Sequence, residues 1–277
     1  MMYDRPFYES RTKNKIFDCH AWAHPNFPVH MHKHIEFVYV AGGELKMTVS
    51  GKEYLVRPGD CVLVFPYQIH SFSSDGEVDL TLVIADMEYV GEFQEELAYN
   101  EMVCPYFHKT ELSSYGVKIL DLIRESAYDK DVPYQLDKGL FMVLLTDIFR
   151  SLPMNTRQKP ADLTMAQKIL QYINQNILQE ISATEVAKAL GISPYYLSHI
   201  FSEELKITFP NYVAQQRLSF ACDLLRNTKK SVTDISYETG FPNMRTFHRC
   251  FKKQYGCTPM EWRKVNARKK KEVGSAR

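Results

Sequence analysis

The segment SVTDISYETGFPNMRTFHRCFKKQY, residues 231–255, decides the fold of the C-terminal part of this 277-residue chain. It predicts two helices joined by a turn at Gly240, because glycine accepts the positive φ that such a turn requires. Ser231 is placed to cap the first helix with its side-chain oxygen. The aromatic side chains expected on the buried face are Phe241, Phe247 and Phe251. This arrangement is a helix-turn-helix motif.

A second copy of the motif precedes it, in ISATEVAKALGISPYYLSHIFSEEL, residues 181–205. Gly191 lies 49 positions before Gly240, and Phe201 lies 50 positions before Phe251, so the later copy has one extra residue in its turn. The predicted caps and small helix-crossing residues are Ser182 with Glu185, Ser193 with Pro194, Ala187 and Ser236. Two capped copies joined by a helix predict an all-α domain with two helix-turn-helix motifs.

The charge of the chain is divided unequally between its two parts. The whole chain has a net charge of only +1, but residues 161–277 hold 18 Lys+Arg against 10 Asp+Glu. Residues 240–277 alone hold 11 against 2, including the RKKK run at residues 268–271, which a solvated tail would also explain. A basic part suits a polyanion, so attraction to phosphates is expected mainly from the second copy.

The second helix of each copy carries residues outside the apolar pattern, and such a helix fits the major groove of double-stranded DNA. Arginine can bond guanine there and asparagine can bond adenine. The predicted DNA-binding residues are Tyr195, Ser198, His199, Asn243, Arg245, His248, Arg249, Lys252 and Lys253. The competing interpretation is a helical bundle with ordinary solvated faces.

The N-terminal part reads as β-structure followed by helices. Turn signals interrupt β-rich runs across residues 17–86, as in a sandwich or barrel, and residues 114–129 and 134–152 have the periodicity of amphipathic helices. Residues 151–163 are polar and contain two prolines. The sequence therefore predicts a mixed two-domain chain, with a first domain over 1–152, a linker over 153–163 and a helical domain over 164–277.

One stretch of the β-region has an unusual pattern. In VHMHKHIEFVYV, residues 29–40, His30, His32, His34 and Glu36 occupy every second position. Alternate side chains of a strand share one face, so a single strand would carry three imidazoles and a carboxylate on one side.

The helical region resembles the AraC-type transcriptional regulators. The resemblance rests on GISPYYLSHIF, on ITFPNYVAQQRLSFACDLLRNT and on SVTDISYETGFPNMRTFHRCFKKQYGCTPMEWRK. It implies a transcriptional activator or repressor whose two recognition helices enter successive major grooves, held apart by a helix over residues 210–226. It also implies a homodimer and contact with RNA polymerase. The run 202–206 departs from the family, because two glutamates stand where basic residues are common.

The β-region resembles the cupin-type barrels fused to many such regulators. The resemblance rests on H-x-H-x3-E at His30, His32 and Glu36 and on PGDCVLVFPYQIH, residues 58–70, which ends in His70. It implies a pocket for a small polar effector, such as a sugar, lined by these four residues and Trp22, with no metal. In metal-binding cupins the same four positions hold one divalent transition metal, so metal sensing is the alternative. A third interpretation is that the histidines bind nothing.

Other features bear on partners and location. None of the six cysteines forms a C-x-x-C pair, no apolar run would span a membrane, and the N-terminus lacks a secretory pattern, so a cytoplasmic location is expected. The helices over 114–152 resemble a dimerisation element, but their apolar stripe would equally suit packing on the barrel. A metal-dependent cupin enzyme is the remaining class, and the helix-turn-helix pair argues against it.

Overall fold

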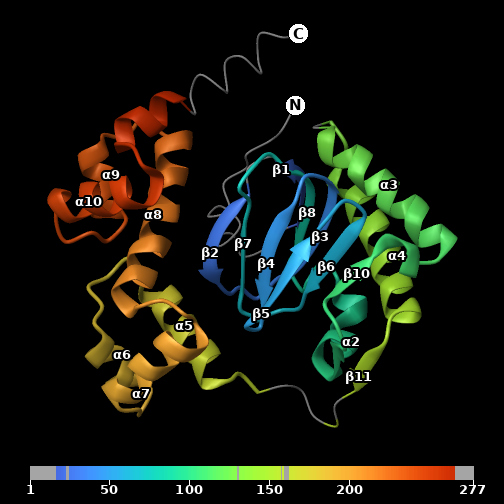
Figure 1. The fold of residues 1–277 in the computed structure, drawn as a ribbon, viewed down its shortest axis with the longest axis horizontal. Helices are drawn as coiled ribbons and strands as arrows, with labels where there is room; N and C mark the ends of the chain where they lie inside the picture. The colour runs from blue at the N-terminus through green and yellow to red at the C-terminus, as the bar shows by residue number, and fades with distance from the viewer. Residues whose placement is uncertain (1–16, 23–24, 130, 157, 159–161, 266–277) are drawn as a thin grey trace. The chain divides into compact units, whose positions relative to one another are not determined.

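The structure is a computed structural model that describes residues 17–22, 25–129, 131–156, 158 and 162–265 (Figure 1). It divides into two compact units, of which the first runs to Gln167 and the second begins at Lys168. The predicted linker contains a short strand, β11 (Met154–Thr156), which pairs with β9 (Asn100–Met102) of the first unit.

The first unit is built on two larger antiparallel sheets. One sheet has the strand order β1-β8-β3-β6-β10 and the other has the order β2-β7-β4-β5. Their strands are β1 (Phe17–Trp22), β8 (Asp79–Ala85), β3 (Ile35–Gly42), β6 (Asp60–Val64), β10 (Tyr106–His108), β2 (Asn26–His30), β7 (His70–Ser73), β4 (Leu45–Val49) and β5 (Lys52–Val56). The predicted β-rich stretch of residues 17–86 is thus confirmed.

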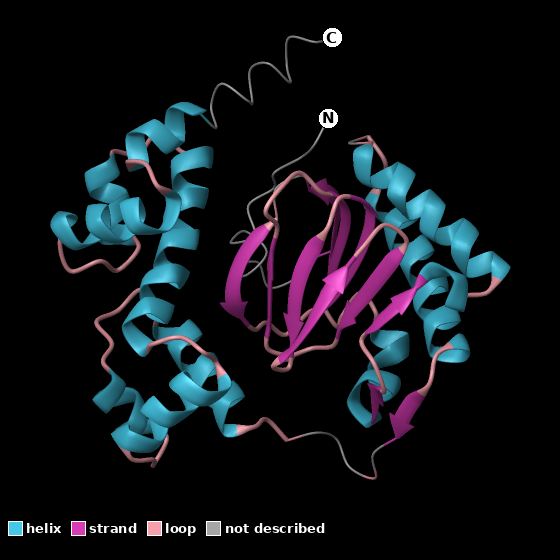
Figure 2. Cartoon of the chain, viewed as in Figure 1, coloured by secondary structure: helices cyan, strands magenta, loops and turns pink. Residues whose placement is uncertain are grey.

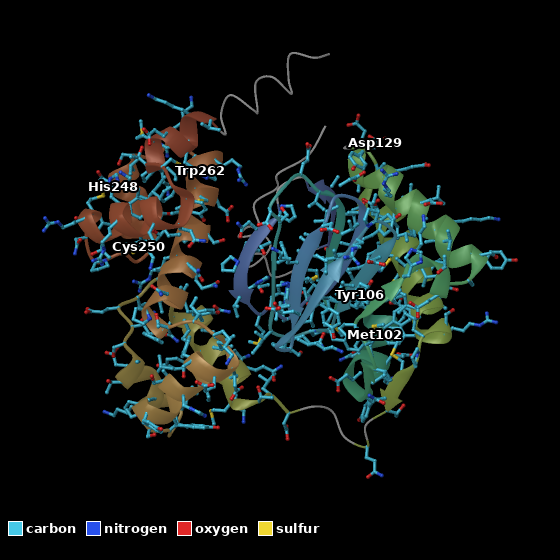
Figure 3. The ribbon with its side chains drawn as sticks, in the orientation of Figure 1. Met102, Tyr106, Asp129, His248, Cys250 and Trp262 are labelled. Atoms are coloured by element: carbon cyan, nitrogen blue, oxygen red, sulfur yellow. The ribbon has the colours of Figure 1, made fainter. Side chains whose placement is uncertain are left out.

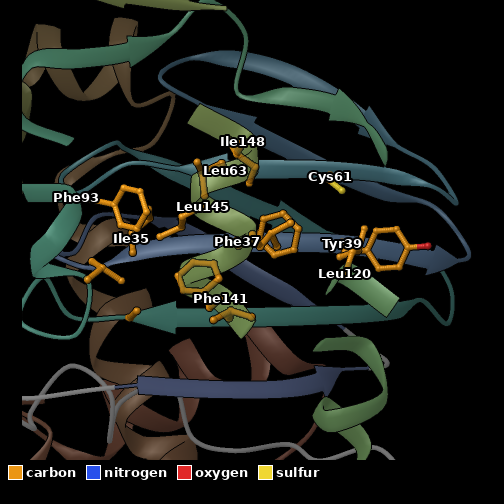
Figure 4. Close-up of a cluster of buried hydrophobic side chains, with 14 of the residues drawn as sticks. Ile35, Phe37, Tyr39, Cys61, Leu63, Phe93, Leu120, Phe141, Leu145 and Ile148 are labelled. Carbon is orange, nitrogen blue, oxygen red and sulfur yellow. The ribbon is translucent and has the colours of Figure 1, made fainter. Parts of the chain in front are cut away.

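Strand β3 is the centre of the five-stranded sheet, since it pairs with both β6 and β8. Phe37 lies opposite Leu63 on one neighbour and Val83 on the other. These residues belong to a buried cluster that includes side chains of the helices α3 (Ser114–Tyr128) and α4 (Tyr134–Ser151), shown in Figure 4. Because successive side chains of a strand point to opposite faces, Glu36 points away from this helix layer.

The two helices are attached to the barrel by their inner faces. The sequence left open whether the apolar stripe of these helices packs against a partner or against the chain's own barrel. Leu120 and Leu144 are fully buried in the cluster with the sheet, so this part of the stripe packs against the barrel. Leu122 and Val143 stay 45% and 49% exposed. An ion pair between Arg124 and Asp79, at 2.7 Å, adds a polar contact between α3 and β8.

Short elements connect β8 to α3 and were not predicted. They are η1 (Gly91–Phe93), α2 (Gln94–Tyr99), β9, β10 and η2 (Lys109–Glu111). No helix in the described part of the chain is long and apolar enough to cross a membrane.

The second unit is helical, as Figure 2 shows. Its elements are α5 (Met165–Asn176), α6 (Ala183–Ala189), α7 (Pro194–His199), the π-helical turn η3 (Ile200–Glu204), α8 (Phe209–Asn227), α9 (Val232–Glu238), α10 (Met244–Tyr255) and helical residues 259–265. The long helix α8 runs from the first motif, α6 and α7, to the second motif, α9 and α10 (Figure 1).

The predicted caps of this unit are confirmed. Ser182 and Glu185 form a capping box at α6, and the hydroxyl of Ser231 accepts a hydrogen bond from the Asp234 N–H at α9. The predicted small crossing residues Ala187 and Ser236 are fully buried, as close helix crossing requires. The three phenylalanines predicted on the buried face, Phe241, Phe247 and Phe251, are also buried and pack with α8.

The inner and outer faces of α3 and α4 should respond differently to truncation. Leu144→Ala should lower the free energy of unfolding of the first unit by about 2–5 kcal/mol, because it opens a cavity in the core. Leu122→Ala is the matched control and should change this free energy by less than about 0.5 kcal/mol. Urea denaturation followed by circular dichroism measures both, and equal losses would show that the outer face is buried against a partner copy.

Candidate functional site

The exposed face of α7 carries the side chains predicted to reach DNA bases from the first motif. Tyr195 is 82% exposed, and Ser198 and His199 are also exposed. Ser193 accepts a hydrogen bond from the Tyr196 N–H at 3.1 Å and so fixes where this helix begins. Leu197 faces the core. The three predicted residues therefore lie on the outer side of a capped helix, as base contact requires.

The exposed face of α10 is basic. Arg245, Arg249, Lys252 and Lys253 are exposed, and His248, labelled in Figure 3, is half-buried beside Phe247. Asn243 caps the helix, because its Oδ1 accepts a hydrogen bond from the Thr246 N–H at 2.8 Å. An amide oxygen has a second lone pair, so the contact of Asn243 with adenine stays a prediction.

The turn after α7 is unsuited to phosphate. Glu203 and Glu204 are exposed there, and Lys206 forms an ion pair with Glu203 at 3.6 Å. Phosphate attraction is therefore concentrated on α10. The basic run at residues 268–271, which the sequence analysis added to this attraction, lies outside the described residues.

The histidine-rich segment of the first unit is not one strand, contrary to the sequence expectation. Strand β2 ends at His30 and β3 begins at Ile35, with a bend between them. His34 turns to Asp86, with its Nε2 3.6 Å from Oδ2, and is not part of the cluster formed by the other histidines. The expected alternation along one strand fails because the segment bends at residues 33–34 and its two parts belong to different sheets.

Four of the predicted residues nevertheless converge. His30, His32, Glu36 and His70 each offer a ligand atom, and these atoms lie within 4.8 Å of one another. All four residues are buried, with exposures from 0% to 8%. They come from β2, the bend, β3 and β7, so the cluster joins the two large sheets of the barrel.

Main-chain carbonyl groups orient all three imidazoles. The Nδ1 atom of His30 lies 2.9 Å from Pro28 O, and the Nδ1 of His70 lies 2.8 Å from Gln68 O. His32 Nδ1 lies 3.2 Å from His34 O. A carbonyl oxygen only accepts, so each Nδ1 carries a proton, and a ring without a second proton has its lone pair on Nε2.

These lone pairs lie beside a buried carboxylate. Glu36 Oε2 lies 3.1 Å from His32 Nε2 and 3.5 Å from His70 Nε2, and Glu36 Oε1 is buried without a hydrogen-bond partner. Burial raises the pKa of Glu36, but His70 and His32 outweigh it and hold the pKa at about 2. Burial, followed by the charge of His32, lowers the pKa of His34 to about 3. The cluster therefore holds an ionised carboxylate that needs positive charge nearby.

The donor set fits a divalent transition metal. Neutral imidazole nitrogens and one carboxylate suit Zn, Fe, Ni or Mn, and histidine ligands commonly donate the other ring N–H to a carbonyl. Adjacent ligands on one such ion are separated by about 3 Å, close to the distances from Glu36 to His32 and His70. His30, His32, Glu36 and His70 are the residues that would hold the ion.

The predicted effector pocket is less well matched by the same geometry. Its four polar residues are enclosed, and Phe27 and Phe72 pack around His30, with ring centroids at 4.5 Å and 6.2 Å. Trp22 pairs with Leu80 in the sheet, but its side chain lies outside the described residues.

Sequence analysis missed the residues that orient the cluster. Pro28, His34 and Gln68 act through their carbonyl oxygens, each two positions from the histidine it fixes. Tyr67 was also missed in this role; its N–H donates to His32 O at 2.8 Å. The two-residue spacing is a local signal, but main-chain acceptors leave no characteristic residue type in a sequence.

Comparison with known proteins identifies related chains for both units. A helix-turn-helix domain matches residues 186–265 and a cupin domain matches residues 22–86. Regulatory protein SoxS of Escherichia coli (strain K12) is 33% identical over 97 residues, which are 35% of this chain and 91% of that protein. HTH-type transcriptional activator RhaS of Mannheimia succiniciproducens is 24% identical over 270 residues, 94% of this chain and 97% of that protein.

A solved structure is similar over nearly the whole chain. Unsaturated fatty acid bound wild-type ToxT from Vibrio cholerae strain SCE256 has a TM-score of 0.56 at 15% identity, covering 91% of this chain and 95% of that one. The predicted fold class is thus confirmed: a cupin-like β-barrel domain with flanking helices, followed by an all-α domain with two helix-turn-helix motifs.

The basic residues of α10 should divide into two functional groups. Changing Lys252 and Lys253 together to alanine should weaken binding to all duplexes alike and lower the salt slope by about 2, because two phosphate contacts are lost. Arg249→Ala should instead relax preference at particular base pairs, by about 1–3 kcal/mol. Fluorescence anisotropy on duplexes selected from a random pool, at several salt concentrations, measures both.

Lys52→Ala, on an exposed lysine of the first unit, is the control and should leave affinity and slope unchanged. Uniform weakening by Arg249→Ala across all sequences would contradict its assignment to base reading.

Proposed function

The chain belongs to the AraC-type transcriptional regulators, and we propose that it binds double-stranded DNA through both motifs under the control of a divalent transition metal in its barrel. The observation that carries the metal proposal is the set of three Nδ1 atoms bonded to carbonyl groups, with the Nε2 atoms of His32 and His70 beside Glu36. This replaces the sequence-based preference for a small polar effector with the metal alternative.

Charge and proton balance support this choice. A hydrogen bond between His32 Nε2 and Glu36 Oε2 needs an added proton, because the Nδ1 proton of His32 is already directed at a carbonyl. A bound cation would supply this positive charge in place of the proton. The residues contribute the rest: they exclude water by burial and hold the ligand atoms from both sheets in place.

A route for a signal starts at the same cluster. The Tyr67 N–H donates to His32 O, and the Tyr67 carbonyl accepts a hydrogen bond from Gln167 Nε2 at 2.7 Å. Gln167 is the last residue of the first unit and lies in the first turn of α5. Tyr67 has a φ of 64°, which is uncommon for a residue other than glycine and is held by these contacts. Movement of His32 would therefore reach Gln167, at the end of the first unit.

A small-molecule effector is the second candidate. The observation that favours it is the similarity to ToxT, whose structure is described as bound to an unsaturated fatty acid. A sugar was the expectation from sequence and stays a prediction. In this version the four polar residues would hydrogen-bond the effector, and the barrel would need to open to admit it, because they are 0–8% exposed.

Assembly belongs to the same proposal. A homodimer would use the outer faces of α3 and α4, where Leu122 and Val143 remain exposed. Activation of transcription would bring the DNA-bound regulator to RNA polymerase. A metal-dependent cupin enzyme is the less favoured use of the cluster, because the named relatives are transcriptional regulators.

Removal of one ligand should abolish metal binding while leaving the fold intact. Glu36→Gln keeps the shape of the side chain but removes its charge, so we expect loss of stoichiometric Zn(II) or Co(II) from chelator-free protein. His32→Ala should do the same, and His108→Asn, on a histidine outside the cluster, is the control. Elemental analysis and the visible absorption of Co(II) measure binding without reference to DNA.

The link to DNA is tested on the same variants. Chelator should change the operator affinity of the wild type by about 5–150-fold, the usual range of coupling, and should leave Glu36→Gln unaffected. Stoichiometric metal without any change in DNA affinity would limit the ion to a structural role. A wild type that takes up none of the four candidate metals would contradict the metal proposal and leave the small-molecule one.

A further inference from the structure

The turn of the second helix-turn-helix motif meets the turn that precedes the first motif, in addition to the connection through α8. Gly240, in the turn of the second motif, has a φ of 79°, and a Cβ added to it would lie 2.9 Å from Leu178 O and 3.1 Å from Ile177 O. Those carbonyl groups belong to the turn between α5 and α6, beside the first motif. Only glycine allows the two turns to approach so closely.

Arg217 completes this junction from the middle of α8. Its Nε donates to Ile177 O at 2.9 Å, and its Nη2 donates to Gln179 O at 2.6 Å. The side chain is only 8% exposed, and burial lowers the pKa of its guanidinium group. The carbonyl groups just beyond the C-terminus of α5 carry partial negative charge, which stabilises a cation in this place.

Three segments therefore meet at one point: the turn at residues 177–179, the turn at Gly240 and the centre of α8. The curvature of a long helix depends on how the helix packs. A second attachment, made by hydrogen bonds and a close backbone contact, fixes the angle between the groups of helices at each end.

We propose that this junction sets the spacing, in base pairs, at which α7 and α10 read DNA. Arg217 and Gly240 are then positioning residues that determine specificity without touching DNA. The inference rests on the proposed DNA binding by both motifs, and it concerns the distance between the two recognised segments rather than the bases within them.

The duplication supplies a matched control. Gly191 holds the equivalent place in the first motif and has a φ of 66°, but a Cβ added to it would have no atom within 4 Å. Gly191→Ala and Gly240→Ala therefore both introduce a side chain at positive φ. Only Gly240→Ala also pushes the two turns apart.

The experiment uses the full chain and double-stranded DNA. Duplexes are selected from a random pool with the wild type, and one base pair is then inserted or deleted between the two recognised segments. The affinity ratio between native and altered spacing is measured for each variant, together with the thermal midpoint of unfolding. We expect a ratio of about tenfold or more for the wild type, as for a lost base contact.

Gly240→Ala should reduce this ratio to about threefold or less, whereas Gly191→Ala should keep the wild-type ratio despite the loss of thermal stability that its positive φ causes. Arg217→Met should resemble Gly240→Ala. Arg217→Lys, which keeps the charge but cannot reach both carbonyls as a fork, should be intermediate and provides a folded variant if the others unfold.

The inference would be overturned if Gly240→Ala and Arg217→Lys kept the affinity ratio of the wild type. It would also be overturned if Gly191→Ala lowered that ratio as much as Gly240→Ala does. Failure to select any duplex would contradict the proposed DNA binding itself and this inference with it. If duplexes are selected but the affinity ratios of the variants equal that of the wild type, only this inference is contradicted.

Discussion

The buried carboxylate of Glu36 is the constraint around which the first unit is arranged. Its strand, β3, is the centre of the five-stranded sheet, and its neighbours in sequence face the helix layer. A carboxylate in such a place costs several kcal/mol unless positive charge or hydrogen bonds compensate it. His32 and His70 provide that compensation, and each is itself held by a carbonyl two residues away. The cost of this polar cluster is the reason for our proposal that it binds a cation.

The second unit also has a buried group held by main-chain carbonyl oxygens. Arg217 is a buried cation, and main-chain carbonyl groups at a helix end orient it, as carbonyl groups orient the three histidines. The two motifs have also diverged from their common pattern. A Cβ at Gly191 would have no atom within 4 Å, whereas Gly240 permits close contact with the turn between α5 and α6. The basic residues are concentrated on α10, while η3 ends the first recognition helix with exposed glutamates. The copies thus share a fold but differ in charge, and we expect the second to provide most of the attraction to phosphates.

Local signals in the sequence were sufficient for most of the helical unit. Capping depends on a side chain and a main-chain N–H three residues away, so Ser182, Glu185 and Ser231 could be assigned without tertiary information. Asn243 shows the limit of this reasoning, since the same residue type can cap a helix or bind adenine; the structure shows the cap. In the barrel, the four-residue cluster was predicted from the family resemblance. The single-strand interpretation was wrong, because a segment that bends between His30 and Ile35 can show the same alternation of residue types as a continuous strand. The carbonyl groups that orient the histidines were beyond prediction, since every residue type provides one.

Whether the cluster acts as a sensor depends on a second state of the loop that carries Tyr67. A ligand that binds one conformation stabilises it by RT ln(1 + [L]/Kd), about 2.7 kcal/mol at a hundredfold excess over Kd. That free energy reaches the DNA-binding helices only if the loop has two arrangements with different affinity for the ligand. The strained φ of Tyr67 and its hydrogen bonds on both sides, to His32 and to Gln167, make it the element best placed to have two. By linkage, DNA binding would then change affinity at the cluster by the same factor as the ligand changes affinity for DNA. A site without such a second arrangement would only hold the two sheets of the barrel together.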